Sequence, residues 1–167
     1  MRRIAFYLLC AVEIQSLSCA DVTKFATANP SGSRLPAADR KALEDSSRFH
    51  EVHSTSDLPP AIVAICAGDK NNLAEPGGKW NPTDVVIDPT LPSKRLIWAA
   101  KGGDYYVMHY ERGGIAHTFH VLVAKLTKGE PKPKMVWSAA GGPFKDYAAF
   151  LDAMGSGKLD DRFDYAH

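Results

Sequence analysis

The stretch KRLIWAAKGGDYYVMHYERGGIAHTFHVLVAKLTKGEPKPKMVWSAA, residues 94–140, decides the fold of this chain. It contains four runs rich in aromatic and β-branched residues, which are typical of strands. We predict strands at residues 94–101, 104–112, 115–126 and 134–140. Gly-Gly pairs at 102–103 and 113–114 separate the first three runs by two residues, which is the spacing of tight hairpins. The stretch therefore predicts an antiparallel four-stranded meander.

Two apolar segments flank this meander and predict helices. In the first, residues 57–67, Ser56 or Asp57 can cap the helix, two prolines suit its first turn, and Gly68 ends it. The second, residues 143–154, carries apolar side chains at helical spacing. We expect an α+β fold in which both helices cover one face of the sheet. Residues 48–53 and 85–87 each leave open a fifth, short strand.

Tight turns at both Gly-Gly pairs would determine the register of the hairpins. Lys101 would then face Asp104, and Arg112 would face Ile115. One face of the sheet becomes the apolar core under the helices, and the other mixes large rings with polar groups. A slip of one residue in either turn would exchange the two faces.

The mixed face is the predicted ligand-binding site. Trp and Tyr serve well as binding anchors. In the predicted register His109 and His120 are diagonal neighbours, with Cα atoms about 7–8 Å apart. With a nearby carboxylate they could hold Zn²⁺ or Cu²⁺, although we assign no metal and no catalytic role. The alternative is that these side chains simply pack under a helix. The predicted site residues are Trp98, Tyr105, His109, Glu111 and His120.

The N-terminus has the layout of a secretory signal peptide. Two arginines precede the apolar run at residues 4–12, and Ser18-Cys19-Ala20 has the small-x-small pattern of a cleavage site. The apolar run is shorter than the roughly 20 residues of a spanning helix. We therefore expect cleavage after Ala20 and no transmembrane segment in the mature chain. Acylation of Cys19 is the alternative.

Removal of residues 1–20 leaves a flexible leader at residues 21–55, with a short helix near 36–46 left open, and a single domain at residues 56–167. Cys66 is then the only cysteine, so no internal disulfide can form. Because Cys66 lies in an apolar run, we expect a buried thiol, with an intermolecular disulfide or a reactive thiol as the alternatives.

Composition and motifs narrow the function classes. The net charge of +1 over 167 residues gives no electrostatic footprint for nucleic acid. The sequence contains no Gly-x-Ser-x-Gly, His-Glu-x-x-His or Cys-x-x-Cys motif. We expect a periplasmic or extracellular binding module without a cofactor, whose partner is a protein, a peptide or a small envelope ligand. The alternatives are a small metal- or His-dependent hydrolase and an envelope-tethered structural protein.

The processing of the N-terminus can be tested directly. Intact-mass spectrometry of the protein from its native host is expected to find a chain that begins at Asp21, because the signal peptidase cleaves after the small residue Ala20. An uncleaved chain would contradict export by this route. A chain that begins at a lipid-modified Cys19 would support the tethered alternative.

Overall fold

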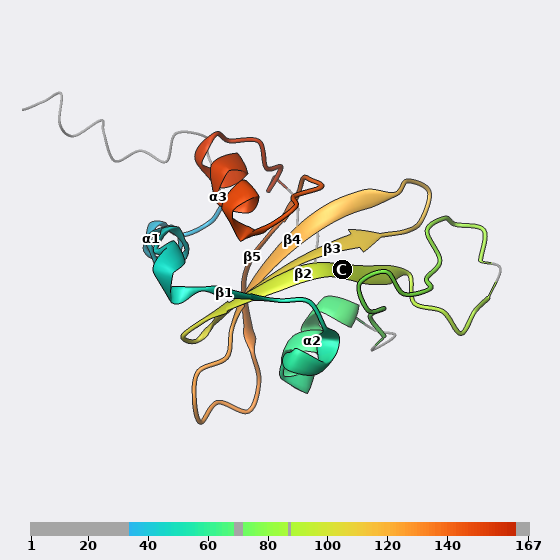
Figure 1. Cartoon of the computed structure of the whole chain (residues 1–167), viewed down its shortest axis with the longest axis horizontal. Helices are drawn as coiled ribbons and strands as arrows, with labels where there is room; N and C mark the ends of the chain where they lie inside the picture. Colours follow the sequence, from blue (N-terminus) through green and yellow to red (C-terminus); the bar gives the residue numbers. More distant parts are fainter. Residues whose placement is uncertain (1–33, 69–71, 87, 163–167) are drawn as a thin grey trace, which may run out of the picture.

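The computed structural model describes residues 34–68, 72–86 and 88–162, so the predicted signal peptide lies outside the described residues. The described residues form a five-stranded antiparallel sheet with helices on both faces (Figure 1). In chain order the elements are α1 (Ala37–Glu44), the 3₁₀ turn η2 (Ser46–Arg48), β1 (His50–Val52), the 3₁₀ turn η3 (Thr55–Asp57), α2 (Pro60–Ala67), β2 (Lys94–Gly102), β3 (Tyr105–Arg112), β4 (Thr118–Lys125), β5 (Lys134–Ala140) and α3 (Tyr147–Gly155).

The sheet has the strand order β1-β2-β3-β4-β5, with every neighbouring pair antiparallel. The predicted α+β class with an antiparallel sheet is confirmed. The four strands of the predicted meander correspond to β2–β5, and the segment at residues 48–53 supplies β1 as a fifth strand. Residues 85 and 86 lie outside any strand. The described chain also has a third α-helix, α1, within the segment predicted to be a leader.

The helices lie on opposite faces of the sheet, which corrects the expectation that they share one face (Figure 1). Alternate side chains of the central strands are apolar on both faces, so each face needs its own cover. On one face, α2 packs Ile62 and Cys66 against Leu96, Met108 and Leu122. On the other face, α1 and α3 pack Leu43, Phe150 and Met154 against Trp98, Val107 and Val121.

The register of both hairpins differs from the predicted one. In the first hairpin Gly102 faces Tyr105, so the pairing moves by two positions and Trp98 keeps its predicted face, but a bulge between Leu96 and Trp98 turns Leu96 to the opposite face. In the second hairpin Arg112 faces Thr118 instead of Ile115. A shift of three positions is odd, so it turns every side chain of β4 to the face opposite the predicted one.

Gly113 explains why the second hairpin lacks a two-residue turn. A Cβ atom at Gly113 would lie 2.1 Å from the carbonyl oxygen of Asn81, and the Gly113 N–H donates to the carbonyl of Ser93 over 2.9 Å. The glycine is therefore needed for the close approach of the segment at Asn81-Pro82. The chain turns later, and the loop between β3 and β4 spans residues 113–117.

The C-terminal end of α2 follows the predicted signal, but the helix begins at Pro60 instead of residue 57, and no side chain caps it. Pro60 occupies its first turn, and Gly68 follows its last residue with φ +72°, a conformation that favours glycine. Cys66 is buried and free, as expected, and burial raises the pKa of its thiol to about 12. None of the helices in the described part of the chain has the length and apolar character needed to cross a bilayer.

A polar cluster attaches α1 to the sheet. Tyr105 and Lys125 both donate to Oδ1 of Asp39, each over 2.6 Å. Burial alone would raise the pKa of Asp39, but the hydrogen bonds from Lys125 and Tyr105 outweigh it and hold the pKa below its ordinary value. The carboxylate therefore stabilises the fold at neutral pH. This contribution is lost as the pH falls through the lowered pKa.

Removal of this carboxylate should weaken the attachment of α1. Asp39→Asn is expected to lower the free energy of unfolding at neutral pH by about 1–2 kcal/mol, because the negative charge that strengthens both hydrogen bonds of this partly buried group is lost. Urea unfolding measures the change. Lys128→Gln, at an exposed position beyond β4, serves as the control. Equal stability of Asp39→Asn and the native chain would show that the cluster contributes nothing.

Candidate functional site

Two of the predicted site residues, Trp98 and His109, hold the backbone of the loop that leads into α3. The indole Nε1 of Trp98 donates to the carbonyl of Phe144 over 2.8 Å. The N–H of Phe144 donates to Nε2 of His109 over 3.0 Å. Both side chains are fully buried, at 0% exposure. The two hydrogen bonds therefore hold residues 141–146 against the sheet.

These contacts determine the protonation of His109. Nε2 accepts from Phe144, so the ring proton lies on Nδ1, which donates to the carbonyl of His120 over 2.9 Å. Burial lowers the pKa of His109 below its ordinary value. The ring also passes close to the loop, since a Cβ atom at Gly142 would lie 2.9 Å from its Cε1. His109 is a neutral imidazole with both nitrogens engaged.

Glu111 lies on the same face as His109 but has partners of its own. It accepts from Nε of Arg95 and lies 2.7 Å from Nε2 of His117. Its side chain is only 7% exposed, whereas that of His117 is 43% exposed. Arg95 also stacks over Trp80, with 5.1 Å to the ring centroid. The carboxylate thus joins strands β2 and β3 to the loop that carries His117.

His120 lies on the opposite face of the sheet from His109. It pairs with Tyr110, whose ring it stacks on at 5.4 Å, and its Nε2 lies 2.7 Å from the hydroxyl of Thr118. Burial, followed by the charges of Arg112 and Lys94, lowers the pKa of His120 to about 4. The imidazoles of His109 and His120 do not converge on one site. No group of three metal-ligating side chains occurs among the described residues.

The structure therefore places four of the five predicted site residues on one face of the sheet and the fifth on the other face. Trp98, Tyr105, His109 and Glu111 share the face that α1 and α3 cover. Tyr105 is half-buried in the cluster with Asp39 and Lys125. The predicted open face of rings and polar groups is a packed interface in this structure.

Three aliphatic side chains point into solvent at one end of the sheet. Ile115 is 97% exposed, Val85 is 68% exposed and Val86 is 52% exposed, and they are the strongly exposed large hydrophobic residues within the described ranges. We call these three residues the apolar tip. They belong to two loops, at residues 81–92 and 113–117, which lie beyond the ends of β2 and β3 (Figure 1).

Backbone and side-chain contacts hold the two loops together. Thr83 forms a parallel bridge with Gly114, within two or three residues of each member of the apolar tip. Asn81 is 6% exposed and donates its side-chain amide to the carbonyls of Asp88 and Leu91, over 2.7 and 3.1 Å. The apolar tip is thus presented by loops with internal hydrogen bonds.

A hollow of about 430 Å³ adjoins the apolar tip, and we call it the hairpin hollow. Ile115 belongs to both features. Arg112 supplies the fixed positive charge of the lining, and Thr118 and His120 supply polar atoms. The lining residues are Arg112, Gly113, Gly114, Ile115, Ala116, Thr118 and His120.

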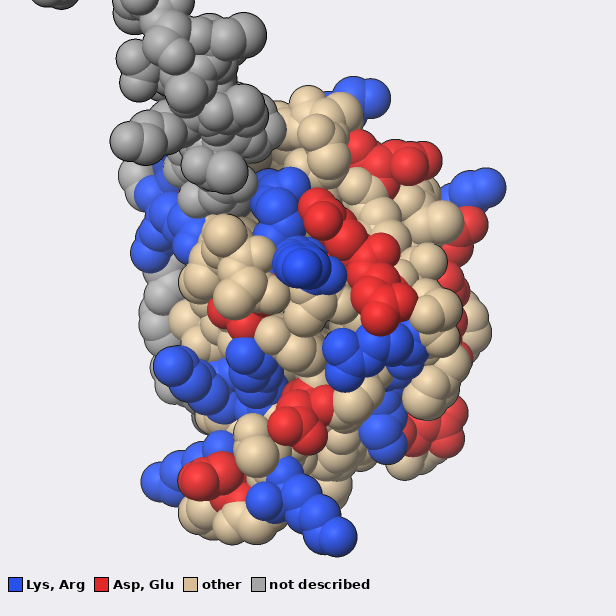
Figure 2. Space-filling model, turned by 90° about the vertical axis from the view of Figure 1, so that its left-hand side faces the viewer, with Lys and Arg blue, Asp and Glu red and all other residues tan. Residues whose placement is uncertain are grey.

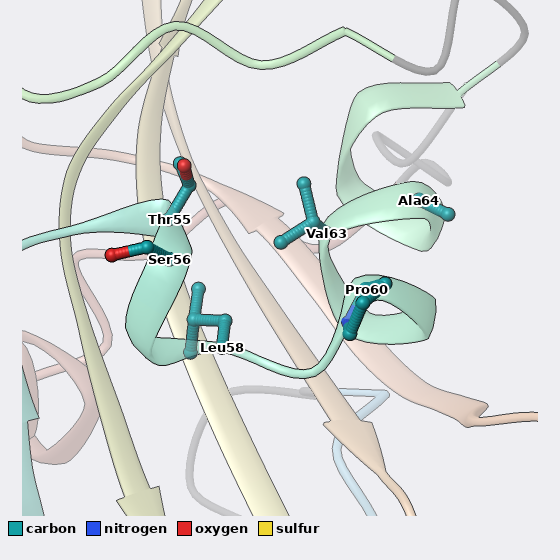
Figure 3. Close-up of a pocket in the computed structure, with 6 residues that line it drawn as sticks. All are labelled: Thr55, Ser56, Leu58, Pro60, Val63 and Ala64. Carbon is teal, nitrogen blue, oxygen red and sulfur yellow. The ribbon is translucent and has the colours of Figure 1, made fainter.

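A second hollow, of about 440 Å³, lies between η3 and α2 (Figure 3). Val63 points from α2 toward η3, and none of the described residues that line the space is charged. The hydroxyl of Thr55 already donates to the carboxylate of Glu75. A ligand site needs polar groups that orient its ligand, so the hairpin hollow is the better candidate.

The opposite end of the molecule offers a different kind of surface. Figure 2 faces the side that lies at the left in Figure 1, and it shows basic and acidic side chains interspersed over that side. Mixed charges of this kind are ordinary for a solvated surface. The apolar tip differs from this surface because it exposes aliphatic side chains instead of charged ones.

Sequence reasoning missed the apolar tip and His117. A short strand at residues 85–87 was left open, and Ile115 was expected to pair with Arg112. The available signal was the position of the two valines between Pro82 and Pro89 in a polar loop, because flanking prolines disfavour a strand. The pairing of His117 with Glu111 depends on the observed hairpin and has no local signal.

Comparisons of the chain with protein-family models, with curated proteins and with solved structures return no match.

Because His120 is buried, we expect the folded protein to lose stability in acid. Since the folded state lowers the pKa of His120 from 6.5 to about 4, the unfolded chain takes up the proton first as the pH falls. As the pH falls from about 7.5 to about 5, this difference in the pKa of His120 should lower the free energy of unfolding by about 2 kcal/mol. Urea unfolding at the two pH values measures the decrease. His120→Gln should reduce this dependence, and His53→Gln, at an exposed position, should leave it unchanged. An equal acid dependence in His120→Gln would contradict the assignment.

Proposed function

We propose that this protein is an exported binding module that docks a protein partner through the apolar tip. The observation that carries the proposal is the exposure of two aliphatic side chains in neighbouring loops, Ile115 at 97% and Val85 at 68%. Complete burial of an aliphatic side chain of this size contributes about 1.5–3 kcal/mol. The proposal keeps the binding role expected from the sequence and moves it from the sheet face to the loops at one end.

The charges around the apolar tip favour a protein over a lipid surface. Asp84 directly precedes Val85, and Asp88 follows in the same loop. Segments that insert into bilayers combine apolar side chains with Lys and Arg, which anionic headgroups attract. Arg112 lies near Ile115, but the carboxylates next to Val85 and Val86 oppose such contact at the larger part of the apolar tip. A protein surface with an apolar patch is the better fit.

The construction of the loops also supports docking. The hydrogen bonds of Asn81 and the bridge between Thr83 and Gly114 restrict the backbone before any partner arrives. A preformed surface loses less conformational entropy on binding. Trp80 and Arg95 stack at the same end of the sheet, and both residue types are common among the residues that dominate binding energy.

Site-specific photo-crosslinking tests the surface. A photoreactive residue placed at position 115 or 85 of the full chain, expressed in its native host, is expected to form the same covalent adduct with one protein. The same residue at position 128, in the loop beyond the other end of β4, should not form it. Adducts with lipid alone, with a second copy of the chain, or equally at position 128 would contradict the proposal.

Binding measurements with the identified partner give the energetic test. Ile115→Ser and Val85→Ser should each weaken binding on the order of tenfold, because each removes an apolar contact from the interface. Lys128→Ser is the matched control and should bind as the native chain does. Isothermal titration calorimetry measures the affinities, and unchanged melting curves exclude unfolding. If both Ile115→Ser and Val85→Ser bind the partner with the affinity of the native chain, the apolar tip is not the contact surface.

A further inference from the structure

We propose that His117 and Glu111 form a pair that hydrolyses small apolar esters, with His117 as the general base and Glu111 as the residue that positions it. The observation that carries the inference is a partly exposed imidazole that is hydrogen-bonded to a buried carboxylate. The inference goes beyond the proposed docking function and does not depend on it, because it assigns a reaction to side chains outside the apolar tip.

The contact with Glu111 determines where the ring proton of His117 lies. Nε2 of His117 is 2.7 Å from Oε2 of Glu111. An ionised carboxylate only accepts hydrogen bonds, so Nε2 donates and the free lone pair of the neutral ring is on Nδ1. Within the described ranges Nδ1 has no hydrogen-bond partner, and the side chain of His117 is 43% exposed. Nδ1 is therefore available to take a proton from water.

Contacts on both members of the pair maintain this geometry. The side chain of Glu111 is only 7% exposed, and its second oxygen accepts from Nε of Arg95. The ring centroid of His117 lies 5.0 Å from that of Phe119 and 5.3 Å from that of Trp80. A carboxylate that fixes the tautomer and orientation of an imidazole, and leaves the other ring nitrogen open, is the arrangement that prepares a histidine for general-base catalysis.

The other histidines of the described residues lack this combination. Both ring nitrogens of His109 are engaged. Burial lowers the pKa of His120 to about 4, which makes it a weak base. His53 is 63% exposed, but its Nε2 lies 3.6 Å from Oε2 of Glu51, which is too long for a hydrogen bond. His50 is exposed and has no hydrogen bond or ion pair with a described residue.

The surroundings of His117 define the class of substrate. Trp80 and Phe119 are both half-buried, so part of each ring remains exposed beside the base and offers contact to an apolar group. A positioned base contributes about 10²–10⁴-fold to a rate. Acceleration of this size suits an ester with a good leaving group, such as an aryl ester of a short acid, better than an amide.

The reaction is hydrolysis of the ester C–O bond. Nδ1 of His117 takes a proton from a water molecule while the water oxygen bonds to the carbonyl carbon. When the tetrahedral intermediate collapses, the bond to the leaving oxygen breaks and the imidazolium returns the proton to that oxygen. The products are a carboxylic acid and an alcohol or phenol. Glu111 stabilises the imidazolium while it exists.

Hydrolysis of 4-nitrophenyl acetate by the full chain tests the proposal. At neutral pH the native chain is expected to hydrolyse the ester at least about tenfold faster than an equal concentration of N-acetylhistidine, and His117→Gln should lose this excess. His53→Gln is the matched control, because it removes a more exposed imidazole near a carboxylate, and it should keep the excess. A native rate no higher than that of N-acetylhistidine, an excess that survives in His117→Gln, or an equal loss in His53→Gln would overturn the proposal.

Glu111→Gln tests the positioning role. It should lower the rate and move the rising limb of the pH–rate profile to lower pH, because the imidazolium loses its counter-charge. A lower rate with an unmoved profile would show that Glu111 only supports the fold, and would overturn its assigned role. Melting curves identify the folded variants. If Glu111→Gln does not fold, the comparison of His117→Gln with His53→Gln, both at exposed positions, decides the proposal.

Discussion

The backbone of Phe144 is held from two sides by side chains of the sheet, and much of the structure depends on this contact. The indole of Trp98 donates to its carbonyl, and the imidazole of His109 accepts from its N–H. A buried backbone N–H or carbonyl without a partner costs free energy. The two rings supply partners for Phe144, and residues 141–146 can therefore leave the sheet and lead into α3. The same contact requires His109 to be neutral and leaves no room for a side chain at Gly142.

This use of Trp98 and His109 explains where function can lie. With α1 and α3 on one face of the sheet and α2 on the other, the central strands have little surface left for a partner (Figure 1). The loops beyond the strand ends remain, and loops on a rigid scaffold are common places for binding. The apolar tip and the hairpin hollow both belong to such loops, and they share Ile115.

The limits of sequence reasoning can be traced to particular residues. The strands and the helix before Gly68 were predictable, because their composition and end signals are local. The Gly-Gly pair at 113–114 looks like a tight turn, but Gly113 is needed for contact with Asn81, 32 positions earlier in the chain by their residue numbers. This contact moves the pairing of β4 by an odd number of residues and separates His109 from His120. The candidate site predicted from those two residues depended entirely on that register.

The sequence by itself determined the antiparallel strands, the main helices and the buried, unpaired Cys66, since periodicity and composition act over a few residues. Only the tertiary structure decided which face each side chain of β4 occupies, which helix covers which face, and which apolar residues stay in water. Those outcomes depend on contacts between distant segments, such as Trp98 with Phe144 and Asn81 with Gly113. Local patterns contain no information about such contacts, because the alternating side chains of these strands would suit an apolar environment on either face.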